Sequence, residues 1–298
     1  MKKLFIIIIL CICNLNLYSK DTIQTKINKN FYKFLAAEGL VLTGAITYLK
    51  YEWYHDKKRV PFHFYNDFKG WNQVDKFGHF YASYLESNIG YSLLKKFRFS
   101  EKKSLYFGGF QGLVLETPIE FFDAYYQGWG FSLSDMAANA FGSLFFIMQQ
   151  KFFGQQLIKP KLSFSKSIYA KDANGLLGKN SLLSQFVYDY NGYTYWFSFS
   201  PNKIFKLNKI PKWLNFAVGY GANGMLGEFE NKLIYRGIEL PNYKRFRQFY
   251  FSLDIDFSKV QTNSKFLKRV FNIISYIKVP MPTIELSNKK FKGHYLFF

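Results

Sequence analysis

The sequence is poor in the side chains that most enzymes and metal proteins use. Its 298 residues include 2 Cys and 4 His, and both cysteines, Cys11 and Cys13, lie near the N-terminus. If that segment is removed, the remaining chain has no thiol, which excludes disulfides and thiolate chemistry. We find no glycine-rich phosphate loop, no Gly-x-Ser-x-Gly motif and no zinc-protease helix. A zinc enzyme usually uses two or three histidines, whereas only His79 is well placed here.

Acidic residues are also scarce, with 20 Asp and Glu against 40 Lys and Arg and a formal net charge of +20. Such a charge favours an anionic partner. Nucleic acid is not expected, because no recognition motif is present and the N-terminus predicts export. Membrane lipid or an envelope glycan is the expected partner, since each Lys or Arg near an anionic surface contributes about 1 kcal/mol. An outer-membrane protein complex is the alternative.

The N-terminus has the order of a signal peptide. Lys2 and Lys3 precede an apolar run over residues 4–13, which is too short to span a bilayer, and polar residues follow up to Lys20. We therefore predict a signal peptide over residues 1–19; a retained membrane anchor is the alternative. The residues before the two cysteines fit a lipidation signal poorly. The expected location is the periplasm of a bacterial-type cell envelope, in association with a membrane, the outer rather than the inner.

Aromatic residues are abundant at 21% of the chain, with 36 Phe and 23 Tyr. Amphipathic rings in this number indicate extensive interfacial surface, where one edge lies in water and the other in lipid. An AT-rich genome, which enriches Phe, Tyr, Lys, Asn and Ile together, is an alternative explanation for part of the excess.

Residues 20–158 predict a bundle of about four helices, because their apolar runs lack strand-like alternation. The predicted helices cover 31–54, 76–97, 103–126 and 132–153. Acidic residues interrupt three of them, so we expect the bundle to be partly embedded in a membrane or to lie against one. Small residues spaced by four indicate close helix packing, as at Gly108 and Gly112 or Ala138 and Gly142.

Residues 159–298 predict a small antiparallel β-sheet of about six strands, which makes the fold class α+β. Strands are expected at 161–169 and 213–220, and at 249–257, where apolar and polar residues alternate. Asn191-Gly192 predicts a tight hairpin turn, because both residues tolerate positive φ. A helix is expected over 263–276. The glycine-dense stretch 219–224 predicts a turn or bulge in preference to a cofactor loop.

Polar residues recur at helical spacing within the predicted bundle. One acidic–basic pair begins the second helix, with a histidine one turn later, and three carboxylates share a face of the third helix. A hydroxyl and a carboxylate three residues apart form an N-cap signal for the fourth helix. The candidate polar cluster comprises Asp75, Lys76, His79, Glu116, Glu120, Asp123, Ser132, Asp135 and Asn139.

Two interpretations of this cluster compete. In the favoured one it is a structural network, in which some members cap helices and others satisfy one another inside the bundle. In the other it is a ligand or acid–base site, where His79 with Glu120 or Asp123 acts on an envelope lipid or holds a divalent metal. No cofactor is expected, and catalysis is not favoured. A separate basic surface loop is expected to suit lipid headgroups; it contains Lys95, Lys96, Arg98, Lys102 and Lys103.

The order of these motifs resembles a known family. The elements are Asp75-Lys76-x-x-His79-Phe80, Glu120-x-x-Asp123 and Gly130-x-Ser132-x-x-Asp135-x-x-x-Asn139-x-x-Gly142. Over residues 70–150 they resemble the YfiM-like predicted periplasmic proteins and, more distantly, the VanZ-like membrane proteins. The second half looks like the longer Bacteroidetes-type members. The resemblance implies an envelope location and a helical bundle, and it implies no reaction. From the sequence as a whole we expect a non-catalytic protein that binds or organises at a membrane surface.

Overall fold

The computed structural model describes residues 50–54, 56–178, 181–205 and 210–298, together with single positions between 32 and 48. The predicted signal peptide and both cysteines lie outside the described residues, as do ten of the 24 positions of the predicted helix 31–54; its described positions are helical. The chain divides into two units, Met1–Thr43 and Gly44–Phe298, and both the helical bundle and the sheet belong to the second. Among the described residues, no helix combines the length and the apolar character needed to cross a membrane.

The helical part is built from α3 (Val74–Lys96), α5 (Gln111–Asp123) and α6 (Leu133–Phe153), each of which contacts the other two. The short helices η2 (Gly70–Gln73), α4 (Glu101–Lys103) and η3 (Ser104–Gly108) precede or connect them. The predicted helices 76–97 and 132–153 are confirmed as α3 and α6. The predicted helix 103–126 is instead divided between η3 and α5.

Glycines allow α5 and α6 to approach the backbone of α3 closely. A Cβ atom on Gly112 would lie 1.9 Å from the carbonyl oxygen of Ser83, and one on Gly142 would lie 2.3 Å from that of Phe80. Between the helices, Ser143 Oγ lies 2.9 Å from the hydroxyl of Ser83 and 2.9 Å from that of Ser87. Serine hydroxyls at close helix crossings therefore replace the bulky apolar side chains of an ordinary bundle.

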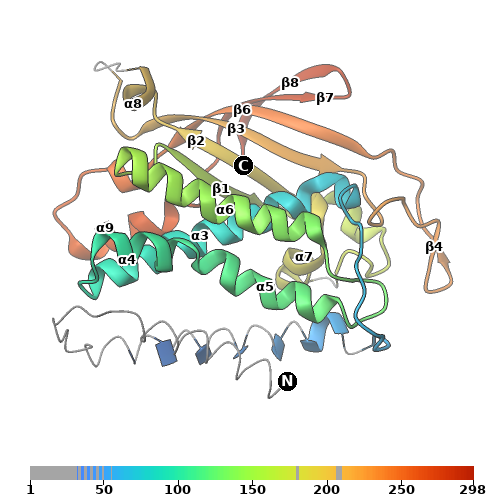
Figure 1. Ribbon diagram of the computed structural model, residues 1–298. Helices are drawn as coiled ribbons and strands as arrows, with labels where there is room; N and C mark the ends of the chain where they lie inside the picture. The colour runs from blue at the N-terminus through green and yellow to red at the C-terminus, as the bar shows by residue number, and fades with distance from the viewer. Residues whose placement is uncertain are drawn as a thin grey trace. The chain divides into compact units, whose positions relative to one another are not determined.

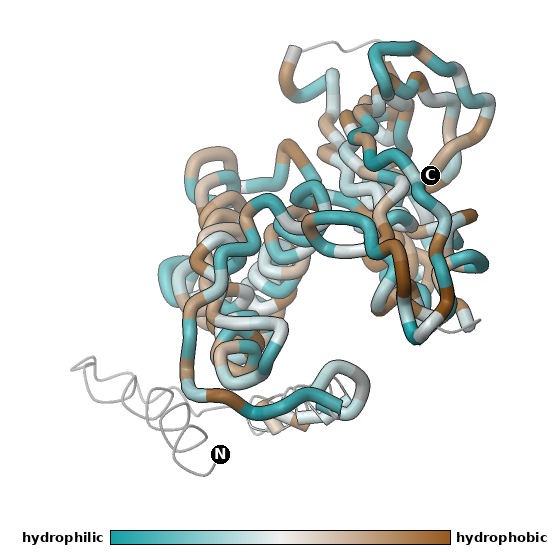
Figure 2. Tube along the Cα trace, turned by 90° about the vertical axis from the view of Figure 1, so that its right-hand side faces the viewer, coloured by the Kyte–Doolittle hydropathy of each residue, from teal (hydrophilic) through white to brown (hydrophobic). Residues whose placement is uncertain are grey.

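A six-stranded antiparallel sheet follows the helices, with strand order β1-β2-β3-β6-β7-β8 (Figure 1). Figure 2, turned by 90°, shows the helices seen end-on to one side and the sheet on the other. The strands are β1 (Ile158–Phe164), β2 (Tyr193–Phe199), β3 (Leu214–Asn223), β6 (Phe246–Ile255), β7 (Met281–Ser287) and β8 (Lys290–Phe297). A two-stranded ribbon contains β4 (Ile234–Tyr235) and β5 (Ile238–Glu239). Helical segments η4 (Ile168–Lys171), α7 (Leu182–Tyr188), η5 (Tyr190–Gly192), α8 (Pro201–Phe205), η6 (Phe257–Lys259) and α9 (Lys265–Ile274) lie between strands.

The α+β class and the helix at 263–276, observed as α9, are confirmed, but two local predictions are wrong. Asn191-Gly192 is no hairpin tip: it lies in η5, between α7 and β2. The strand predicted at 161–169 ends at Phe164, and η4 begins at Ile168. The glycine-dense stretch continues β3 as far as Asn223, and the positive φ of 74° comes only at Gly224.

One face of the sheet is polar, and this face is buried. Lys161 Nζ on β1 lies 2.6 Å from Asp254 Oδ2 on β6, and both side chains are fully buried. Lys159 Nζ pairs with Asp256 Oδ1 at 2.7 Å. Two strands separate β1 from β6, which would place them about 14 Å apart in a flat sheet. Contact between these side chains therefore requires the sheet to curve around its polar face.

The opposite face is apolar and only partly covered. The α3 helix packs on it through Phe77, whose ring centroid lies 4.8 Å from that of Tyr220, and through Phe80, 5.6 Å from Phe197. Further along the sheet, five apolar side chains of this face are 37% to 52% exposed: Val218, Phe249, Phe251, Ile284 and Leu286. Cross-strand pairing makes them contiguous, because Val218 pairs with Phe251 and Phe251 with Ile284.

The close approach of α5 to α3 gives a first prediction. Gly112→Ala should lower the free energy of unfolding by about 1–3 kcal/mol, because the new methyl group meets backbone that cannot rotate away. Gly293→Ala is the matched control, since a Cβ there meets nothing within 4 Å. Urea unfolding of both variants measures the difference; equal stability of the two would show that the helices are not in this contact.

Candidate functional site

The buried ammonium group of Lys76 holds three carboxylates together at the start of α3. Lys76 Nζ lies 2.8 Å from Asp67 Oδ2, 2.9 Å from Asp75 Oδ2 and 2.7 Å from Asp135 Oδ1. These carboxylates come from the loop before η2, from α3 and from α6. One cation thereby joins three segments of the chain that are distant in sequence.

The backbone that leads into α3 is strained. Trp71, Asn72 and Gln73 have φ values of 45°, 49° and 66°, a left-handed conformation that side chains other than glycine adopt rarely. The Trp71 ring stacks on Tyr190 of η5 with centroids 4.9 Å apart, which holds this turn against the segment that precedes β2. The turn brings Asp67 back over the beginning of α3.

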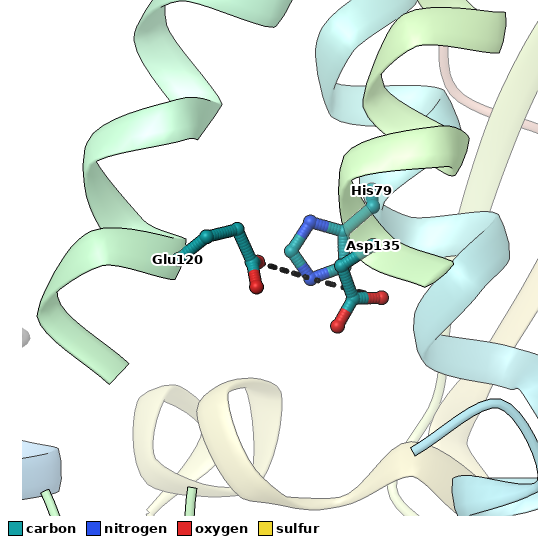
Figure 3. Close-up of side chains that lie close together, drawn as sticks. All are labelled: His79, Glu120 and Asp135. Carbon is teal, nitrogen blue, oxygen red and sulfur yellow. Dashed lines mark ion pairs between the residues drawn. The ribbon is translucent and has the colours of Figure 1, made fainter. Parts of the chain in front are cut away.

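His79 lies one turn after Lys76, and its side chain is 21% exposed. Its Nδ1 atom is 3.2 Å from Asn139 Oδ1 and 3.7 Å from Glu116 Oε2. Its Nε2 atom is 3.9 Å from Glu120 Oε1 and 3.7 Å from Asp135 Oδ1 (Figure 3). The ring therefore stands between α5 and α6, with acceptor atoms on both sides.

Ser132 connects the two ends of this cluster. Its hydroxyl caps α6 by accepting a hydrogen bond from the Asp135 N–H at 3.0 Å, and it donates to Asp67 Oδ1 at 2.6 Å. Its own N–H donates to Glu120 Oε2 at 3.1 Å. The predicted N-cap is confirmed, whereas the Asp135 carboxylate binds Lys76 and does not cap the helix.

Asp123 differs from the expectation that it acts with His79 and Glu120. The Tyr54 hydroxyl donates a hydrogen bond to Asp123 Oδ1, which directs that carboxylate toward η1 (Lys50–Tyr54). Among the described residues, the ligand atoms that come within 4.8 Å of one another belong to His79, Glu120 and Asp135, or to Asp67, Asp75 and Asp135. Asp135 thus takes the position that the sequence suggested for Asp123.

Burial and mutual proximity shift the protonation equilibria of the cluster. Burial raises the pKa of Glu120 to about 8 and that of Asp123 to about 7. Burial alone would lower the pKa of His79, but the negative charges of Asp135 and Glu116 outweigh it and raise this pKa to about 9. An imidazolium is accordingly favoured at neutral pH, with protons shared among the carboxylates around it.

The Lys76 end of the cluster behaves differently. Burial would lower the pKa of Lys76, but Asp75 and Asp135 outweigh it and hold the pKa above its usual value. Burial raises the pKa of Asp75 to about 6, while hydrogen bonds, chiefly with Asp135 and Lys76, hold that of Asp67 at about 2 despite burial. Lys76 and Asp67 therefore stay charged across the physiological range.

All nine residues of the predicted cluster lie where α3, α5 and α6 meet. Lys76, His79 and six others form one group, whereas Asp123 lies apart, beside Tyr54. Sequence reasoning missed Asp67, Ser134 and Tyr54. Ser134 Oγ donates to Asp67 Oδ1 at 2.7 Å. Asp67 lies in a loop without periodicity, so only its position eight residues before Asp75 could have drawn attention to it.

The five residues of the predicted basic surface loop lie at the other end of the bundle. All are exposed, and they occupy the end of α3, α4 and the residues between them. Lys95 Nζ pairs with Glu101 Oε2 at 2.8 Å, and both side chains are largely in water, so this pair contributes little to stability.

A family model described as "Predicted periplasmic lipoprotein (DUF2279)" matches residues 64–151. The matched segment includes the cluster from Asp67 to Asn139. The match supports a periplasmic location in the cell envelope, while the YfiM-like, VanZ-like and Bacteroidetes-type resemblances stay predictions. No curated protein and no solved structure matches the chain.

The pKa shifts predict that the protein loses stability as the pH rises. Glu120, Asp123 and His79 all have pKa values above their ordinary ones, so the folded state retains protons that the unfolded chain releases. Stability linked to such groups is full at low pH and is lost as the pH rises toward the folded-state pKa. In chelator-containing buffer, the melting temperature should fall from about pH 5 to about pH 8, and Glu120→Gln should reduce that slope.

Exposed Glu239→Gln is the control and should leave the slope unchanged. A wild-type melting temperature that stays level or rises over this range would contradict the assigned direction of the shifts.

Proposed function

We propose that this protein is a non-catalytic cell-envelope protein that binds the surface of an anionic membrane through the outer face of α6 and the basic surface loop. The observation that carries the proposal is the inverted polarity of α6. In water, a surface helix exposes polar residues and buries apolar ones. A helix with the reverse arrangement is suited to contact with lipid.

The exposed face of α6 is mostly apolar, with Lys151 near its end. Five side chains on one stripe are 37% to 69% exposed: Leu133, Phe141, Leu144, Met148 and Phe152. The face toward the bundle buries Asp135, Asn139, Ser143 and Gln149 beside the apolar Phe146 and Ile147. Burying each of the larger apolar side chains in lipid would contribute about 1.5–3 kcal/mol, which is enough to hold a peripheral protein at a bilayer.

Positive charge lies at the end of this stripe. Gln150 Nε2 on α6 donates to the Tyr91 hydroxyl at 3.1 Å, and Tyr91 donates to Glu101 Oε1 at 2.9 Å. These contacts place the basic surface loop beside the last turns of α6. An apolar stripe that ends in a cluster of Lys and Arg is typical of segments that lie at an anionic lipid surface.

Removing apolar side chains from the stripe tests the proposal. The triple variant Phe141→Ser, Met148→Ser, Phe152→Ser should bind vesicles of phosphatidylglycerol and phosphatidylethanolamine at least about tenfold more weakly, since tenfold corresponds to only about 1.4 kcal/mol. Flotation of the full chain with these vesicles measures the bound fraction. Folding should be retained, because all three side chains are exposed.

The matched control is Phe249→Ser, Phe251→Ser, Ile284→Ser, which removes apolar side chains of similar exposure from the sheet. It should bind like the wild type. Loss of binding in the sheet variant, with normal binding in the α6 variant, would show that the lipid contact is on the sheet and would contradict the proposal.

The charge of the loop gives a separate prediction. Lys96→Gln, Lys102→Gln, Lys103→Gln should weaken binding to anionic vesicles and flatten its salt dependence, because the screening length falls from about 10 Å at 0.1 M to about 3 Å at 1 M salt. The control Lys289→Gln, Lys290→Gln, Lys292→Gln removes the same charge from exposed positions around the β7–β8 turn. Equal effects of the two variants would show that net charge alone attracts the membrane.

A further inference from the structure

Three electron-pair donors from three different helices converge beside His79. They come from His79 on α3, Glu120 on α5 and Asp135 on α6, each of which offers one ligand atom within 4.8 Å of the others. Figure 3 shows the Glu120 and Asp135 carboxylates on either side of the imidazole edge that carries Nε2. In the absence of a metal, a proton on His79 supplies the positive charge between the two carboxylates, and a metal ion that displaces this proton would supply it instead.

The separations are too long for direct hydrogen bonds. His79 Nε2 lies 3.9 Å from Glu120 Oε1 and 3.7 Å from Asp135 Oδ1. The same protein contains a direct pair for comparison, since His294 Nε2 lies 2.7 Å from Glu285 Oε2. Ligands at about 2.0–2.2 Å from a divalent ion lie about 3–3.5 Å from each other, so each of the two oxygens would have to move about half an ångström toward Nε2.

The other ring nitrogen of His79 is oriented as it is in metal ligands. Asn139 Oδ1 can only accept a hydrogen bond, so at 3.2 Å it requires the proton on Nδ1. The lone pair of a neutral ring then lies on Nε2, facing Glu120 and Asp135. A histidine that binds a metal typically donates its second N–H to a carbonyl or carboxylate, which fixes both the ring and its tautomer.

The Glu120 carboxylate supplies an independent observation. Its side chain is 1% exposed, and its Oε2 atom is engaged by the Ser132 N–H at 3.1 Å. Its Oε1 atom, directed at His79, has no hydrogen-bond partner among the described residues. A buried carboxylate oxygen without a partner costs about 1–3 kcal/mol or more, which a bound cation would relieve.

The balance of charges around His79 also favours a bound cation. Five carboxylates (Asp67, Asp75, Glu116, Glu120 and Asp135) lie around the ammonium of Lys76 and the imidazole of His79. Lys76 bridges Asp67, Asp75 and Asp135, but its single positive charge does not balance three carboxylates, so Asp135 can be shared with a second cation. At the other end, His79 is the one basic side chain that forms an ion pair with Glu116 and Glu120 among the described residues, and a divalent ion there would offset the excess negative charge.

We propose that His79 Nε2, Glu120 and Asp135 bind one divalent transition-metal ion. One imidazole nitrogen with carboxylate oxygens suits Zn²⁺ or Mn²⁺, whereas Ca²⁺ prefers six to eight oxygen ligands. Asn139 and Glu116 orient the histidine from behind. The site is independent of the membrane contact, which uses the opposite face of α6.

Metal titration of the full chain, with any affinity tag removed and after dialysis against chelator, tests the site. Zn²⁺ should bind at one ion per chain by calorimetry and should raise the melting temperature, while Ca²⁺ at the same concentration should not. Glu120→Gln should weaken Zn²⁺ binding at least about tenfold, the equivalent of about 1.4 kcal/mol. Glu285→Gln, which removes the carboxylate beside His294, should bind as the wild type does.

Co²⁺ provides a readout that does not depend on the variants. Bound to the wild-type chain, it should give a visible absorption band that one equivalent of Zn²⁺ abolishes, even if Glu120→Gln fails to fold. Wild-type protein that binds neither ion, or a folded Glu120→Gln that binds Zn²⁺ with unchanged affinity, would overturn the proposal. Equal stabilisation by Ca²⁺ would also overturn it, since it would indicate an oxygen-only site without His79.

Discussion

A carboxylate that leaves water needs a proton or a cation beside it, and the arrangement of the helical bundle follows from this requirement. Asp67, Asp75 and Asp135 come from three segments and meet at a single ammonium group. Without Lys76 the three negative charges would repel one another, and the loop before η2 would lose its ion pair with α3. The left-handed turn at residues 71–73 costs about 1–3 kcal/mol for each strained residue, and the charge network is the interaction that compensates for it.

The same requirement explains how polar groups are buried in both halves of the molecule beside apolar clusters. Ser143 bridges helices through hydroxyl groups, and Lys161 and Asp254 neutralise each other inside the curve of the sheet. Where paired polar groups occupy the interior, some large apolar side chains are left exposed. In water such an exchange forgoes much of the hydrophobic free energy that usually stabilises a domain. A lipid surface against α6 would restore part of it, which is the physical basis of the proposed membrane contact.

The sequence predicts those features that depend on neighbours along the chain. The helices α3 and α6, the Ser132 cap and the alternation of β6 all follow from local spacing, and the structure agrees with each. The hairpin at Asn191-Gly192 failed because tertiary contacts outweigh turn preference. Asp189 Oδ1 accepts from the Asn191 N–H, and the Asn191 amide pairs with the backbone of Met225, 34 residues away.

The sequence predicts which residues form the cluster, but it does not predict which of them contact one another. Helical spacing indicates that Glu116, Glu120 and Asp123 share a face, but it does not show which carboxylate turns toward His79. That choice depends on Tyr54, which comes from outside the three helices and engages Asp123. Likewise the alternation in β6 reveals a polar and an apolar face, and only the partners on β1 determine that the polar face is buried.

Charge is distributed along the bundle in a way that would orient it at a membrane. The helices α3 and α6 run parallel, because residue numbers increase along both in the contacts His79–Asn139, Ser83–Ser143 and Tyr91–Gln150. The carboxylates therefore surround the positive ends of both helix dipoles, and the basic surface loop lies at the negative ends. At 1.5 Å per residue, about 24 Å separates His79 from Lys95. With the exposed stripe of α6 along an anionic surface, the basic end would be attracted more strongly than the acidic end. The His79 cluster, on the opposite face of α6, would then face the aqueous side, where a metal ion can enter.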